Sequence, residues 1–401
     1  MILKTLVTPL ALNFGLSAAT SAALLLIVGV SSGATMVGLV GLWMGYAIIF
    51  SQFISFGMQN GIFEVCRDEP KLAFVFTKVS FLLSIIIALV LCGLIHLVSY
   101  WLYDFHSLNT NALLLYTFAI SVQKLLRSSY TIIDRFNDFH FISIFKSVVT
   151  AFIGGSILFG LIEIENIFYA LTLMELLTSL VMLAFLLQKD QCYHQFDMRK
   201  SIILIKRSYL GFISNSIYEI NSKVDIVICS LLLTPLHLGI YTTVVTVFEG
   251  FIALCTLRKS ETYIDFLEAI KTKNIRVVDL KIKSEMLFLF KWLLPCFASG
   301  LIYVFVTIGE LSVLTALMLA LMLVAANLLG GVLGLQNIYY TCGKQDVFSK
   351  IMFSALFLNI FGSVVLVYFI GMFGIGLSTA VVTGYVAFQM RRKIGVVNER
   401  L

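Results

Sequence analysis

Two cationic side chains, Lys124 and Arg127, stand inside the apolar stretch 112–133. On a helix a spacing of three residues places both side chains on one face. A charged group at the centre of a membrane helix costs roughly 2.5–3.5 kcal/mol on insertion scales, so it normally faces a bundle interior or a wet cavity. Arginine binds phosphate bidentately and lysine acts as a point charge. The pair therefore predicts an anion site.

The alternative for these two cations is structural pairing with acids in other apolar stretches, such as Glu175 or Glu249. A third cation, Lys146, lies near the expected cytoplasmic end of the stretch 142–162. We expect its side chain to snorkel towards the membrane surface.

A second polar group lies in the stretch 208–233, where Asn215, Glu219 and Lys223 recur every four residues. This spacing places them on one helical face, so they are further candidates for binding a substrate. Glu219 and Lys223 can also form an ion pair between adjacent helical turns, which would make both residues structural.

Three acids in apolar surroundings are candidates for binding a coupling ion. Asp225 has no evident partner nearby in the sequence, and Glu175 and Glu249 are isolated acids near the middle of their stretches. Intramembrane carboxylates often take part in ion or proton pathways. We expect a proton or Na⁺ at one or more of these residues.

The composition places these residues in a membrane. The chain has 401 residues, of which 60% are hydrophobic and 12% are charged, and its mean hydropathy is +0.99. A soluble domain has about 45–50% apolar and about 25% charged residues. A chain of this length holds roughly a dozen spans of about 20 residues. We therefore expect an all-α polytopic membrane protein.

The apolar stretches and the basic residues agree on the topology. The expected spans are 5–30, 37–62, 76–98, 112–133, 142–162, 167–188, 208–233, 238–257, 287–307, 312–335, 351–369 and 372–390. The first and every second connection after it contain neither Lys nor Arg, whereas each of the other connections contains at least one of them. Because cytoplasmic loops carry an excess of these residues, we expect both termini in the cytoplasm.

The sixth connection divides the chain into two halves, 1–195 and 196–401, with six spans each. A weak internal repeat supports this division. Val37-Gly38-Leu39 and Leu238-Gly239-Ile240 lie 201 residues apart, and each segment follows a turn and opens a span. Repeats related by an axis along the membrane normal occur in transporters.

Several classes of function are excluded by what the sequence lacks. The seven cysteines show no metal-ligand spacing, and there is no nucleotide-binding fingerprint, so we expect no metal, cofactor or ATP. The net charge of +6 comes from short loops, which argues against nucleic acid as a partner. A membrane polysaccharide polymerase would need a long outer loop with catalytic residues, and the expected outer loops are short. We expect no enzyme activity.

Two stretches carry a resemblance to a known family. INSKVDIVICSLLLTPLHLGIYTTV, at 220–244, resembles the seventh span and following turn of bacterial polysaccharide flippases of the O-antigen (Wzx) type. RSSYTIIDRFNDFHFISIFK, at 127–146, is similar to their fourth-span exit and fifth-span entry. These flippases belong to the multidrug/oligosaccharidyl-lipid/polysaccharide exporter superfamily.

The resemblance implies two six-helix bundles in a V around a central cavity and alternating access. It implies export of an undecaprenyl-diphosphate-linked oligosaccharide from the cytoplasmic to the periplasmic leaflet of the bacterial inner membrane. Membrane lipids and the polysaccharide polymerase machinery are the implied partners. Related flippases often carry an arginine in the first span; this chain has none there, and its only early charge is Lys4.

The alternative is a multidrug or cation antiporter of the same fold. A cavity dominated by cations favours the flippase, and one dominated by acids favours the antiporter. The count of buried charges is mixed, and the resemblance decides for the flippase.

Overall fold

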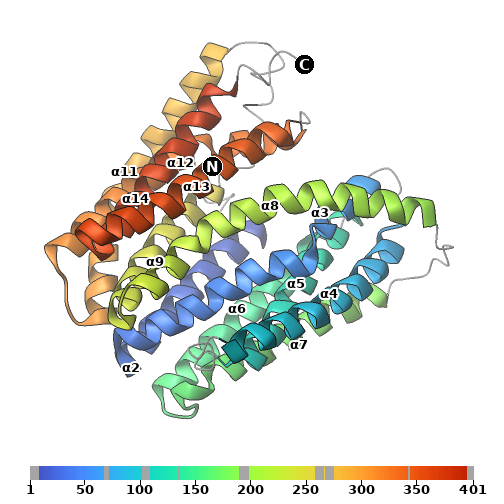
Figure 1. Cartoon of the computed structure of the whole chain (residues 1–401), viewed down its shortest axis with the longest axis horizontal. Helices are drawn as coiled ribbons and strands as arrows, with labels where there is room; N and C mark the ends of the chain where they lie inside the picture. The colour runs from blue at the N-terminus through green and yellow to red at the C-terminus, as the bar shows by residue number, and fades with distance from the viewer. Residues whose placement is uncertain are drawn as a thin grey trace. The chain divides into compact units, whose positions relative to one another are not determined.

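The computed structural model describes residues 9–66, 72–101, 109–133, 136–188, 198–257, 266, 275–341 and 344–394. All regular structure in these ranges is helical (Figure 1), as the sequence predicts. The elements are α2 (Pro9–Ser55), α3 (Met58–Cys66), α4 (Ala73–Trp101), α5 (Thr110–Ile132), α6 (Phe136–Leu158), the 3₁₀ turn η3 (Ile164–Asn166), α7 (Ile167–Leu187), α8 (Met198–Leu232), α9 (Pro235–Leu257), α11 (Ile275–Ile308), α12 (Val313–Thr341), α13 (Gln345–Ile370) and α14 (Met372–Arg392).

Helix α2 consists of two helices that meet at Gly33. The backbone there has φ 79° and ψ 174°, a conformation that is essentially restricted to glycine. The kink lies in the expected connection 31–36, so the two arms of α2 correspond to the first two expected spans. A second break follows at Phe56 (φ 44°) and Gly57 (φ 64°), after which α3 begins.

Within the described residues, nine helices are long and apolar enough to cross a membrane, and the longest stretch, Gly15–Ser55, has 41 residues. That length suffices for two spans of about 20 residues. Helices α5 and α8 are not among the nine, and both carry candidate site residues in their sequences. With these two helices and both arms of α2, the described helices match the twelve expected spans.

The starts of two helices differ most from the prediction. Helices α8 and α11 begin at Met198 and Ile275, about ten residues before the apolar stretches that predict them. Their first turns are rich in Lys and Arg and therefore escape a search for apolar runs. Residues 1–8 and 395–401 lie outside the described residues, and the cytoplasmic position of both termini stays a prediction.

The chain forms two compact units. Unit 1 comprises Met1–Thr20 and Trp43–Glu219, and unit 2 comprises Ser21–Leu42 and Ile220–Leu401. The boundary expected between 195 and 196 lies in 189–197, outside the described residues, and stays a prediction.

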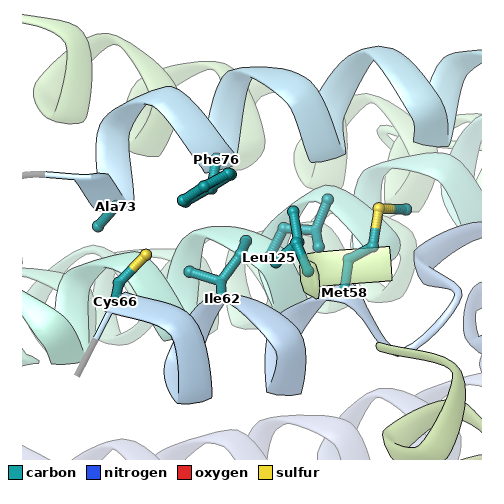
Figure 2. Close-up of a cluster of buried hydrophobic side chains, with 7 residues drawn as sticks. Met58, Ile62, Cys66, Ala73, Phe76 and Leu125 are labelled. Carbon is teal, nitrogen blue, oxygen red and sulfur yellow. The ribbon is translucent and has the colours of Figure 1, made fainter. Parts of the chain in front are cut away.

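In unit 1, α5 is the central helix, because α3, α4, α6 and α7 all pack against it. One buried apolar cluster of this unit joins α3, α4, α5 and α8 (Figure 2). It consists of Met58, Ile62, Cys66, Ala73, Phe76, Leu125 and Leu204. The cluster packs the starts of α4 and α8 against α3 and α5 and thereby positions the polar face of α5.

In unit 2, α12 packs against α9, α11 and α14, and α13 packs against α14. The two repeat glycines of the sequence touch each other in this unit: a Cβ on Gly38 would lie 2.8 Å from the backbone nitrogen of Gly239. One turn further along, a Cβ on Gly41 would overlap the side chain of Thr242. Small residues thus permit close helix packing here.

Candidate functional site

The polar face of α5 borders a cavity of about 190 Å³ inside unit 1. Residues from the start of α2, from α5 and from α6 line it: Asn13, Ser17, Gln123, Arg127, Phe139, His140, Ser143, Lys146 and Ser147. The α6 residues follow one helical face, since they recur at intervals of three and four. Among the described residues that line the cavity there are two cations and a histidine, and none is a carboxylate.

Arg127 is the cation of this cavity that is available to a ligand. Its side chain is exposed, and within the described part of the chain its guanidinium has neither a hydrogen bond nor an ion pair. A guanidinium carries five N–H donors in a planar fork. Beside it, Asn13 Nδ2 lies 2.8 Å from His140 Nδ1, which orients the imidazole at the cavity wall.

Lys146 has its own counter-ion. Its Nζ lies 2.6 Å from Glu175 Oε1, and the Glu175 side chain is only 3% exposed. Gln123 Nε2 donates to the other carboxylate oxygen at 2.6 Å and lies 3.2 Å from Ser179 Oγ. The Tyr116 hydroxyl also bonds to Glu175. Glu175 is thus a buried, fully bonded carboxylate that holds Lys146 at the cavity edge.

The expectation that Lys146 snorkels is therefore wrong. Helix α6 begins at Phe136, not at 142, so Lys146 lies ten residues into the helix rather than at its end. Glu175 is not isolated either, and its pairing with Lys146 removes it as a counter-ion for Lys124 or Arg127.

Lys124 faces another part of unit 1. Its Nζ donates to Ser51 Oγ at 2.8 Å, and Glu219 lies close enough to interact with it electrostatically. Lys124 does not line the cavity that Arg127 borders. The two cations that the sequence predicts to form one anion site thus both lie on α5 but face different parts of unit 1. Asn215 and Glu219 are half-buried on α8.

In unit 2, Asp225 is buried, with 2% of its surface exposed. The Tyr241 hydroxyl donates to its Oδ2, and Thr379 Oγ1 donates to the same oxygen at 3.1 Å. The Ile226 amide lies 2.9 Å from Oδ1. The two side-chain partners come from α9 and α14, which explains why no side chain near Asp225 in the sequence is an evident partner. Within the described residues no cation forms an ion pair with it.

Glu249, expected to be isolated, forms an ion pair with Lys223, and their side chains are 45% and 12% exposed. This pair crosses from α8 to α9. The structural alternative that placed Glu249 against Lys124 or Arg127 is therefore wrong for the described residues.

Sequence reasoning missed Asn13, Gln123 and His140 and misassigned Lys146. Asn13 and Gln123 are uncharged, so no insertion penalty draws attention to them. One signal was available: His140, Ser143, Lys146 and Ser147 lie at helical spacing in a stretch of mostly large apolar residues, which predicts a polar stripe.

Neither the protein-family models nor the curated proteins include a match to this sequence. Solved structures do match it. An inward-facing multidrug resistance MATE family transporter of the MOP superfamily aligns with a TM-score of 0.69 at 12% identity, over 96% of each chain. The chain has the MATE transporter fold. A mutant of the Vibrio cholerae MATE transporter VcmN aligns with a TM-score of 0.59 at 14% identity, over 97% of this chain and 94% of the other.

An outward-facing MATE family transporter also matches, with a TM-score of 0.61 at 14% identity, over 97% of this chain and 94% of the other. The MATE fold and the many apolar helices together make this a multi-pass membrane protein. Within that fold, the cationic cavity belongs to unit 1 and the Asp225 site belongs to unit 2.

Proposed function

We propose that the protein is a secondary transporter that moves a lipid-linked oligosaccharide, joined to its polyprenol by diphosphate, to the outer leaflet by alternating access. The observation that carries this proposal is the cavity of unit 1. Its described lining contains Arg127 and Lys146 and no carboxylate, and among the described residues the Arg127 guanidinium has no partner. Such a site suits an anion.

The chemistry of a diphosphate fits these groups. Arg127 can donate two parallel hydrogen bonds to one phosphate, and such charge-assisted bonds are about twice as strong as neutral ones. Lys146 adds a positive point charge at the cavity edge. Hydroxyl and amide groups from Ser17, Asn13 and Gln123 can bond to the sugar or to the remaining phosphate oxygens.

For energy coupling we propose Asp225. Glu175 and Glu249 are both paired with lysines, whereas Asp225 is held by two hydroxyl groups and a backbone amide. A hydroxyl can donate or accept a hydrogen bond. The surroundings of Asp225 can therefore serve the carboxylate and its protonated form, and a proton or Na⁺ moving down its gradient would drive transport.

The proposed setting is the bacterial inner membrane, with both termini in the cytoplasm and export feeding the polysaccharide polymerase machinery. The second candidate function is multidrug or cation antiport, which the names of the matching structures favour. A cationic drug would need an acidic lining, and among the described residues the cavity of unit 1 has none.

The test is deletion of the gene from its host, followed by complementation. Loss of surface polysaccharide and retention of the lipid-linked precursor in the cytoplasmic leaflet are the expected results. If export of the glycan continues unchanged and sensitivity to cationic drugs rises, the flippase proposal fails and the antiporter function is favoured.

In the same assay Arg127→Ala should lower export by about tenfold or more, because a charge-assisted hydrogen bond contributes about 1.5–3 kcal/mol. Arg127→Lys should restore part of it, since the charge remains but the fork is lost. Arg391→Ala is the matched control, because that arginine pairs with Asp279 at an exposed site and should be silent. Equal export by wild type and Arg127→Ala would place the anion site elsewhere.

A further inference from the structure

Three oxygen atoms at Asp225 share only two hydrogens. The Tyr241 hydroxyl donates to Asp225 Oδ2, and Thr379 Oγ1 donates to the same oxygen at 3.1 Å. The two hydroxyl oxygens are themselves 3.1 Å apart. Each hydroxyl group has one hydrogen, so when both hydrogens point at the carboxylate, none lies between the two hydroxyl oxygens. A cation that attracts all three oxygens would stabilise this arrangement.

Further oxygens lie beside these three. Asn359 Nδ2 donates to the backbone oxygen of Asn221 at 3.3 Å. In an α-helix that oxygen faces the backbone amide four positions later, which is the amide of Asp225, so the Asn359 side chain lies next to Asp225. Asn359 Oδ1 accepts from Ser363 Oγ at 3.3 Å. The side-chain oxygen of Asn221 is also buried, and within the described part of the chain it has no hydrogen-bond partner.

Two consecutive residues of α14 connect these oxygens. Thr379 bonds to Asp225, whereas Ser378 Oγ lies 3.3 Å from the backbone oxygen and 3.5 Å from Oδ1 of Asn359. Helices α8, α9, α13 and α14 thus all contribute to one buried group of side chains in unit 2. We call this group the oxygen cluster, and it consists of Asp225, Tyr241, Asn359, Ser363, Ser378 and Thr379.

The oxygen cluster contains one carboxyl group and no cationic side chain. Among the described residues Asp225 forms no ion pair, and Lys223, two positions before it on α8, pairs with Glu249. A buried carboxylate without a cation is costly. Carboxylate, carbonyl and hydroxyl oxygens are the ligands that hard cations prefer. One carboxylate balances the charge of a monovalent cation but only half the charge of Ca²⁺ or Mg²⁺.

We propose that the oxygen cluster binds Na⁺, an inference that rests on the coupling role proposed for Asp225. Asp225, Tyr241 and Thr379 would each give the ion one oxygen, since both hydroxyl groups can turn their hydrogens away and offer lone pairs. The carbonyl oxygen of Asn359 would replace part of the hydration shell. A proton is the competing occupant. It would need one carboxylate oxygen and no carbonyl ligand, so it gives the buried amide of α13 no role.

The experiment measures binding of ²²Na⁺ to the purified full-length protein by equilibrium dialysis in choline chloride. Saturable binding of a single ion per chain is expected. Unlabelled Na⁺ should displace the label, and K⁺ at the same concentration should not. Asp225→Asn should abolish the binding. Absence of saturable binding, equal displacement by K⁺, or binding that persists in Asp225→Asn would overturn the proposal.

Two buried threonines provide a matched pair of variants. Thr379→Val removes a hydroxyl group of the oxygen cluster and keeps the shape of the side chain. Thr243→Val makes the same change on α9, where the hydroxyl group donates to Gly239 O within its own helix. The Kd for Na⁺ should rise by about tenfold or more in Thr379→Val and stay unchanged in Thr243→Val. Equal Kd values for the two variants contradict the oxygen cluster.

A second measurement does not depend on Thr379→Val. An ion that binds only the folded state raises the melting temperature. NaCl should therefore raise the melting temperature of the wild type and of Thr243→Val above the value in KCl of equal concentration, and it should not do so for Asp225→Asn. The same melting temperature of the wild type in both salts, at concentrations that saturate ²²Na⁺ binding, would contradict the site.

The site and the proposed function fail in different ways. If the wild type binds Na⁺ through Asp225 while deletion of the gene leaves glycan export intact, the oxygen cluster stands and the proposed function fails. If export requires Arg127 while the purified protein binds no Na⁺ and a proton gradient alone drives transport, the function stands and the Na⁺ site fails.

Discussion

The polar sites of the two units differ in how their charges are satisfied. At the cavity of unit 1, Lys146 forms an ion pair with a buried carboxylate. Arg127 lines the same cavity without an ion pair among the described residues. In unit 2 the buried carboxylate of Asp225 has hydroxyl and amide donors and no ion pair among the described residues. The first arrangement places a permanent positive charge at the wall of a cavity. In the second, no cation of the described residues pairs with the carboxyl group, which suits the proposed coupling role. Binding an anion and responding to a gradient require these two different properties.

The largest effect is expected from breaking the fixed pair in unit 1. Lys146→Met leaves Glu175, whose side chain is 3% exposed, without its cation, and such a change costs about 3–5 kcal/mol. The melting temperature of the purified protein should fall accordingly. Lys350→Met, at an exposed site, should change it little, and Lys146→Met with Glu175→Leu should recover much of the loss. If Lys146→Met lowers the free energy of unfolding by less than about 1 kcal/mol, the ion pair is accessible to water.

A change in function rather than stability is expected at Asp225. In Asp225→Asn the amide oxygen still accepts from Tyr241 or Thr379, so the folded state should lose about 1 kcal/mol. Transport in proteoliposomes should no longer respond to an imposed proton or Na⁺ gradient, because the site cannot change its charge. Asp279→Asn, at an exposed pair with Arg391, is the control and should keep the response. A gradient response equal to that of the wild type would remove Asp225 from coupling.

The smallest effect is expected at the pair of Lys223 and Glu249. Because Glu249 is 45% exposed, a double-mutant cycle with Lys223→Met and Glu249→Gln should give a coupling energy of roughly 0.2–1 kcal/mol. Export should remain near the wild-type level. A coupling above about 2 kcal/mol would mean that the pair is desolvated in the membrane, and the contrast between the two units would then be weaker.

The fold follows from the sequence because its signals are local and strong. Apolar runs and the alternation of basic loops define the spans, and Gly33 stands in the connection where the helix bends. The starts of α8 and α11 do not follow from apolar runs, since their first turns are basic and lie before the runs.

The site follows only in part, because pairing depends on depth and rotation. The sequence correctly predicts that Lys124 and Arg127 lie on one helix, α5. It does not predict that Lys124 bonds to Ser51 while Arg127 lines the cavity.

The pair of Lys146 and Glu175 does not follow from the expected spans, because Lys146 lies four residues after the expected start at 142 and Glu175 lies 13 before the expected end at 188. In the structure α6 begins at Phe136, so Lys146 lies ten residues after that start and Glu175 lies twelve before the end of α7 at Leu187. The earlier start of α6 brings the two charges to a similar depth.

The contact of Gly38 with Gly239 has a consequence for which amino-acid substitutions the chain can accept. Position 38 meets position 239, and position 41 meets position 242, each pair 201 residues apart. In a symmetric homodimer a substitution at such a contact appears on both sides at once. In a single chain the two positions change independently, as in a heterodimer. Gly41 opposite Thr242 already has this form, since the glycine leaves the space that the threonine fills.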